Sequence, residues 1–87
     1  MRTIVIDFRD FENARKLHEF LACHLDFPDY YGRNLDALFD VLSTEARDTS
    51  VLVVNREAAF SDGFLAVFRA VSAENPHFTY AVDGSKR

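Results

Sequence analysis

Three short apolar runs, separated by segments of helical periodicity, constrain the fold of this chain most strongly. The runs cover residues 3–8, 51–54 and 78–82 and are rich in β-branched and aromatic side chains, which predicts strands. Between them, apolar residues recur at spacings of three and four, which predicts amphipathic helices. The resulting order β-α-α-β-α-β permits right-handed crossovers, so we expect a small α/β layered domain with a three-stranded parallel sheet.

The three runs differ in how completely they are apolar. Residues 4–6 and 51–54 are continuous, a pattern typical of strands that are covered on both faces or lie centrally in a parallel sheet. Residues 78–82 alternate more loosely. We therefore expect the third strand at an edge, with one partly wet face.

Capping residues and prolines mark the expected helix ends. A first helix is expected between Asp10, which can cap it, and Pro28. A second runs from residue 33 or 34 to about 45, and a third, which Ser61 or Asp62 can cap, runs until the Asn75-Pro76 pair. Their apolar faces are expected to consist of Phe11, Ala14, Leu17, Leu21 and Leu25; of Leu35, Leu38, Phe39 and Leu42; and of Phe64, Val67, Phe68 and Val71.

Length, charge and cysteine content limit the class of protein. With 87 residues there is room for one hydrophobic core, so residues 1–87 are expected to form a single domain. A formal net charge of −4 disfavours direct binding to nucleic acid or to an anionic membrane, because both need a basic patch. Cys23 is the single cysteine, which excludes an internal disulfide and, with no signal-peptide layout at the start, predicts a cytoplasmic protein.

Aromatic and acidic residues gather in the segment from residue 29 to residue 40. Asp36 and Asp40 are four residues apart, hence stacked on one flank of the second predicted helix beside Phe39. Tyr30 and Tyr31 precede them in a turn. Two adjacent tyrosines do not easily face one core, so one of them is expected to be exposed.

This acidic and aromatic segment has three interpretations. It is a solvated acidic face, as most charge runs are, or a carboxylate pair for catalysis or metal binding, or a surface that binds another protein. Catalysis is disfavoured because so small a domain hardly encloses a pocket, and a metal site usually has more ligands. Aromatic anchors surrounded by charge are typical of binding hot spots. We therefore expect a binding protein with no catalytic residue, no cofactor and no metal site.

The remaining reactive side chains have structural interpretations. His18 falls on the apolar face of the first predicted helix, so we expect a core histidine with a satisfied hydrogen bond. His24 and His77 have no neighbour at metal-ligand spacing and are expected at the surface. Cys23 has no activating base and is expected to be an inert small hydrophobic residue.

Residues 28–38 read Pro-x-Tyr-Tyr-Gly-x-Asn-Leu-Asp-Ala-Leu. With Leu17-His18, Leu21 and Leu25 before it and Leu42 after it, this string closely resembles the barstar family, inhibitors of the bacterial ribonuclease barnase. A weaker likeness covers residues 67–69 and 73–74 of the last predicted helix. The order of strands and helices also agrees with that family from end to end.

The resemblance implies an intracellular inhibitor, monomeric when free, whose second helix and preceding loop enter the active site of a basic, barnase-like ribonuclease. In that family the acid at the position of Asp40 takes the place of a substrate phosphate, because a carboxylate accepts charge-assisted hydrogen bonds from the same donors. The positions that the resemblance places at the partner interface are Tyr30, Gly32, Asn34, Asp36, Phe39, Asp40 and Glu74.

Three residues depart from the barstar pattern. Phe39 stands where barstar has a larger aromatic residue, Arg33 where it has an acid, and Ala70 where it has another acid. The surface thus carries fewer acidic residues than in barstar, and at Arg33 the sign of the charge is reversed. We therefore expect the mechanism of inhibition to persist with a different partner. Two alternatives keep the fold: neutralisation of a toxin that is not a ribonuclease, and a regulatory protein-binding module.

Overall fold

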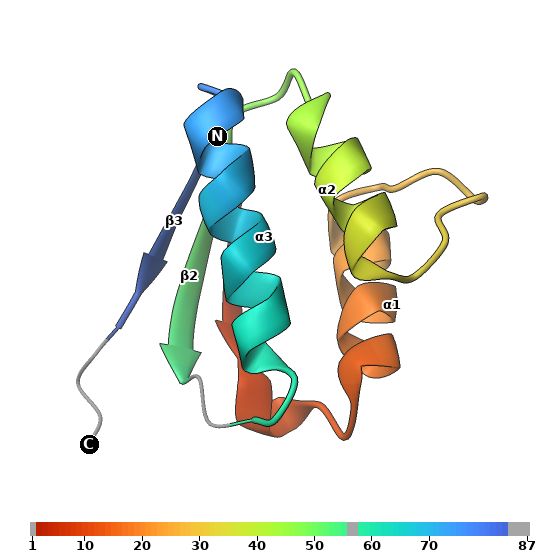
Figure 1. Cartoon of the computed structure of the whole chain (residues 1–87), viewed down its shortest axis with the longest axis vertical. Coiled ribbons are helices and arrows are strands. Elements are labelled where there is room, and N and C mark those ends of the chain that lie inside the picture. The colour runs from red at the N-terminus through yellow and green to blue at the C-terminus, as the bar shows by residue number, and fades with distance from the viewer. Residues whose placement is uncertain (1, 56–57, 84–87) are drawn as a thin grey trace.

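The computed structural model describes residues 2–55 and 58–83 and has two layers, a parallel sheet and three helices on one side of it (Figure 1). The sheet consists of β1 (Arg2–Asp7), β2 (Thr49–Asn55) and β3 (Phe78–Val82), and the helices are α1 (Ala14–His24), α2 (Leu35–Ser43) and α3 (Ser61–Glu74). A short 3-10 helix, η1 (Phe8–Asp10), follows β1. The α/β fold and its order of elements, predicted from the sequence, are confirmed.

The sheet has the strand order β1-β2-β3 with both pairings parallel. Both crossovers step across the sheet in the same direction, and right-handed connections therefore place all three helices on one face. The expectation that the first strand is central or covered on both faces is wrong, because β1 lies at an edge and Val5 points away from the helices with 54% of its surface exposed. The edge position of β3 is confirmed.

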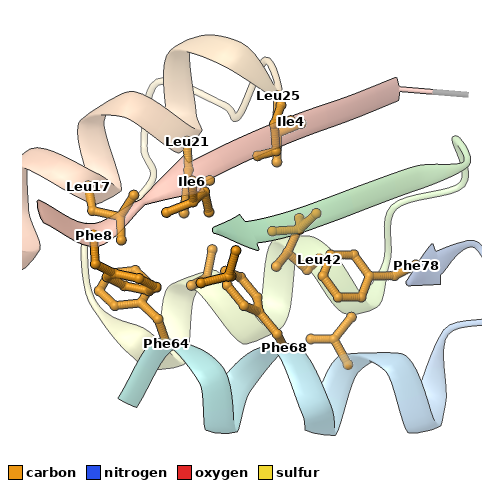
Figure 2. Packing of buried hydrophobic residues seen from close by; sticks show 14 of the residues in the cluster. Ile4, Ile6, Phe8, Leu17, Leu21, Leu25, Leu42, Phe64, Phe68 and Phe78 are labelled. Atoms are coloured by element: carbon orange, nitrogen blue, oxygen red, sulfur yellow. The ribbon is translucent and has the colours of Figure 1, made fainter. Parts of the chain in front are cut away.

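The core fills the space between the sheet and the helices (Figure 2). Ile4 and Ile6 of β1 point into it, and the rings of Phe8, Phe64 and Phe68 are fully buried there. Phe8 and Phe64 meet edge to face with ring centroids 6.1 Å apart. All of the described helices contribute, α1 through Leu17, Leu21 and its C-terminal neighbour Leu25, and α2 through Leu38 and Leu42.

Two of the expected helix caps are wrong. Helix α1 is capped by Asn13, whose Oδ1 accepts the Lys16 N–H at 3.0 Å, because Asp10 is taken up by η1. At α3, Phe60 occupies the N-cap position and makes no side-chain cap hydrogen bond, while the two expected cap candidates, Ser61 and Asp62, are already helical.

Helices α2 and α3 run side by side, and contacts near both of their ends hold them together (Figure 1). At the N-terminal ends, a Cβ added to Gly63 would lie 2.8 Å from Cδ1 of Leu35, so the absence of a side chain at residue 63 permits this close approach. At the other ends, the buried Asn75 amide donates to the carbonyls of Leu42 and Glu45 at 2.8 and 2.9 Å. These contacts with α3 thus fix the position and the tilt of α2.

Candidate partner-binding surface

The outer face of α2 carries the acidic residues predicted from the sequence. Leu38 and Leu42 are buried on the inner side of the helix, and residues about half a turn away therefore face solvent. Asp36 and Asp40 are both exposed. Within the described residues, neither carboxylate is in an ion pair, so both are open to a partner.

Asn34 is the N-cap of α2, close to the expected start of the helix, and it fixes the direction in which these acids point. Its Oδ1 accepts the Ala37 N–H at 2.8 Å and its Nδ2 donates to the Gly32 carbonyl at 3.3 Å. One side chain thereby caps the helix and ties it to the preceding loop. Asp36 lies in the first turn, where a negative charge is favoured by the helix dipole.

An apolar strip lies beside the acids on the flank of α2 that faces α3. Phe39 is half-buried, and Leu35 is 37% exposed although its place in the leucine pattern predicts a core position. Leu35 is the first residue of the helix and lies over Gly63 at the rim of the core. The spacing of the leucines in the sequence did not reveal that Leu35 is exposed. How closely α2 and α3 approach each other depends on Gly63, which lies 28 residues further along the chain.

The two adjacent tyrosines point in opposite directions, as expected. Tyr30 is 87% exposed and Tyr31 only 5%. The Tyr31 hydroxyl lies 2.6 Å from Nδ1 of His18, to which it donates when the imidazole carries its proton on Nε2. The predicted core histidine with a satisfied hydrogen bond is confirmed, and this bond anchors the loop that presents Tyr30.

Burial sets the protonation states of this pair. It raises the pKa of the Tyr31 hydroxyl and lowers the pKa of His18. Both shifts favour the neutral forms, an imidazole and a phenol, which is the combination that the hydrogen bond needs. Tyr31 also packs against Phe27, with ring centroids 4.9 Å apart. The loop before α2 is therefore held by a buried polar contact and an aromatic one.

Tyr30 lies beside α2 across a groove of about 210 Å³. One wall is the loop, and the other is the C-terminal end of α2 together with the two residues that follow it. The lining residues are Asp26, Phe27, Pro28, Tyr30, Val41, Thr44 and Glu45. Asp40 borders this groove, because it precedes Val41 directly and its carbonyl accepts a hydrogen bond from the Thr44 hydroxyl at 3.1 Å.

Glu74, at the end of α3, extends this surface past the end of α2. It is exposed and lies about three helical turns after Gly63, hence on the same flank of α3, the one that contacts α2. Figure 1 shows the C-terminal ends of the two helices at the same end of the molecule. Of the seven predicted site residues, the structure places Tyr30, Gly32 and Asn34 in the loop before α2, Asp36, Phe39 and Asp40 on α2, and Glu74 on the flank of α3 that contacts α2.

Other predicted features are not among these seven residues. His24 and His77 are exposed, as expected, and His77 Nδ1 lies 2.8 Å from Oδ1 of Asp48. Cys23 is exposed rather than packed as a small hydrophobic residue. Among the described residues no group of three or more potential metal-ligating side chains comes together. No helix in the same part of the chain is both long and apolar enough to span a membrane.

Comparisons with known proteins point to one family. The family model described as Barstar (barnase inhibitor) matches residues 1–79. A protein of Bacillus subtilis (strain 168) named "Putative ribonuclease inhibitor YrdF" is 53% identical over 68 residues, which cover 78% of this chain and 74% of that protein. The residues that the family model matches include every predicted site residue, and the sheet and helices described above have the expected arrangement. This chain belongs to the barstar family.

Proposed function

We propose that this protein inhibits a barnase-like ribonuclease by covering its basic active site with α2 and the loop before it. The observation that carries the proposal is the exposed pair Asp36 and Asp40, which has no ion-pair partner within the described residues and shares helix α2 with the half-buried Phe39. A ribonuclease holds RNA phosphates with arginine, lysine and histidine side chains. Free carboxylates accept charge-assisted hydrogen bonds from those same donors.

Each part of the surface has a separate role in this proposal. Asp40 and Asp36 supply charge at the centre, and Glu74 adds an acid at the far end. Tyr30, Phe39 and Leu35 supply apolar area that loses water on binding, and Gly32 and Asn34 present the loop backbone. An interface of ordinary size, about 800 Å² per partner, would cover these groups together.

The charge of the whole chain supports the same partner. A net charge of −4 steers a basic ribonuclease toward the protein and raises the association rate. The related Bacillus subtilis protein carries the name of a ribonuclease inhibitor. In this proposal the protein acts as an immunity protein in the cell that makes the ribonuclease, uses no cofactor and catalyses no reaction.

The test is the residual RNA cleavage by barnase and a panel of small basic bacterial ribonucleases, titrated with the protein and with its Asp40→Ala variant. We expect stoichiometric inhibition of at least one enzyme, and a loss of at least tenfold in affinity on substitution. Truncation of a central charged anchor costs about 2 kcal/mol or more, a range for which barstar–barnase complexes are a standard example.

Glu12→Ala is the matched control. Glu12 is exposed and precedes α1, so this variant makes the same change in charge away from the proposed interface, and its affinity should stay within about twofold of the original because distant surface charges are screened. Inhibition of no enzyme in the panel would overturn the ribonuclease proposal. Equal affinities for the original protein and Asp40→Ala would overturn the role of α2.

A further inference from the structure

We propose that Arg33 determines specificity at this surface and selects a ribonuclease with a carboxylate at the rim of its basic active site. This inference rests on the proposed function and specifies the charge of one group on the partner. Arg33 lies between Gly32 and Asn34, two residues expected at the interface, and contributes a positive charge to a surface otherwise acidic and aromatic.

The backbone at residue 33 does not favour arginine. Its φ of 54° lies in the left-handed region, which glycine adopts readily and most other residues adopt seldom. The loop imposes this conformation from both sides, because Tyr31 is anchored to His18 and Asn34 caps α2. Strained backbone of this kind concentrates at functional sites, which motivates a search for the role of the side chain.

The guanidinium of Arg33 has donors to spare. The side chain is 47% exposed, and within the described part of the chain the one carboxylate within 4 Å is Glu19, with Arg33 Nε and Glu19 Oε2 3.8 Å apart. The same Glu19 oxygen lies closer to Nε of Arg15, at 3.4 Å. A shared, exposed and long ion pair contributes little. Arg33 is therefore free to pair with a group on another protein.

A groove of about 240 Å³ next to Arg33 is able to receive that group. It lies between the C-terminal half of α1 and the loop, and its lining residues are Ala22, Cys23, Phe27, Pro28, Asp29, Tyr31 and Arg33. A partner that covers this open groove would displace water from it, which strengthens an ion pair formed inside. Asp29 lines the groove too, so a partner side chain there meets one charge of each sign.

Covering this loop would remove water from Arg33. Without a partner anion the guanidinium would be buried unpaired, which is costly, whereas a carboxylate opposite it restores the interaction. A ribonuclease with a lysine or arginine at the same place would be repelled. Specificity of this kind depends on the rejected partner as much as on the accepted one.

The experiment compares dissociation constants for the ribonuclease that the original protein inhibits most strongly in the panel that includes barnase. A purely acidic plug would bind a basic enzyme more tightly after Arg33→Glu, because the inhibitor gains negative charge. The proposal predicts the opposite, a loss of about tenfold or more, because the new carboxylate faces a carboxylate.

Two further variants separate this effect from general charge and from folding. Arg15→Glu makes the same charge change beside the same Glu19 on α1, and we expect less than about a twofold change because an exposed charge outside the interface is largely screened. Glycine suits the left-handed backbone at residue 33, so the Arg33→Gly variant should fold at least as well as the original protein. It should still bind the ribonuclease several-fold more weakly, because it lacks the guanidinium.

Equal or tighter binding by Arg33→Glu would overturn the inference, as would full affinity in Arg33→Gly or an equal loss in Arg15→Glu. The Asp40→Ala titration decides separately on the proposed function. If Asp40→Ala weakened binding and Arg33→Glu did not, the proposed inhibition would be supported, and the proposed partner carboxylate opposite Arg33 would be ruled out.

Discussion

At the scale of single residues, the contrast between Tyr30 and Tyr31 explains how a short loop becomes a binding element. Tyr31 gives its ring to the core and its hydroxyl to His18 at 2.6 Å, while Tyr30 points into solvent. His18 in turn packs against Phe64 of α3, with ring centroids 4.8 Å apart. The loop is thereby fixed to α1 and, through the imidazole, to α3.

Removal of the Tyr31 hydroxyl should destabilise the protein. Tyr31→Phe leaves Nδ1 of the buried His18 without its hydrogen-bond partner, so we expect the free energy of unfolding to fall by about 1–3 kcal/mol. Tyr30→Phe removes an exposed hydroxyl and should change it by no more than about 0.5 kcal/mol. Urea unfolding at neutral pH measures both. Equal stabilities for the two variants would contradict the anchoring role of Tyr31.

At the scale of elements, α2 depends on contacts at its two ends. Asn34 caps the N-terminal end and ties it to Gly32, and Asn75 reaches from the end of α3 to the carbonyls of Leu42 and Glu45. Near the same end, Arg2 bonds to Glu45 at 2.8 Å, and hydrogen bonds from Arg47 together with the Arg2 charge hold the pKa of Glu45 down at about 2. The helix is fixed to both layers of the fold.

The cap of α2 is open to a direct test. Asn34→Ala removes the acceptor for the Ala37 N–H and should lower the free energy of unfolding by about 1 kcal/mol, whereas Asn34→Asp keeps an acceptor oxygen and a favourable charge at the helix start. Thermal unfolding followed by circular dichroism compares the two variants. Asn34→Ala as stable as the original protein would show that the cap contributes nothing.

Some elements were predictable from sequence and others were not, for physical reasons. Two features followed from local signals in the sequence. Pro76 shortly precedes β3, and Asn34 directly precedes α2. The exposure of Val5 did not follow from such a signal, because a continuous apolar run does not reveal that helices cover one face only. The cap of α1 was misplaced because η1, an unpredicted turn, takes up Asp10.

At the scale of the whole molecule, topology gathers the candidate site. Successive right-handed crossovers place the helices on one face of the sheet, where α2 packs along α3, so that the outer face of α2 continues from the loop before it toward the end of α3. The family motif predicted the loop and helix residues as a group, since they are neighbours in sequence. The place of Glu74 beside α2 depended on the packing of two helices, which the pattern of neither helix reveals.

Occlusion of the active site is the central claim, and steady-state kinetics tests it most directly. The inhibition of RNA cleavage should be measured at several concentrations of a short RNA substrate, with the ribonuclease that the protein inhibits most strongly. Occlusion predicts competitive inhibition, in which the apparent inhibition constant rises linearly with substrate concentration and kcat is unchanged at saturating substrate. A lowered kcat with an inhibition constant independent of substrate would contradict it, because the partner would then bind away from the active site.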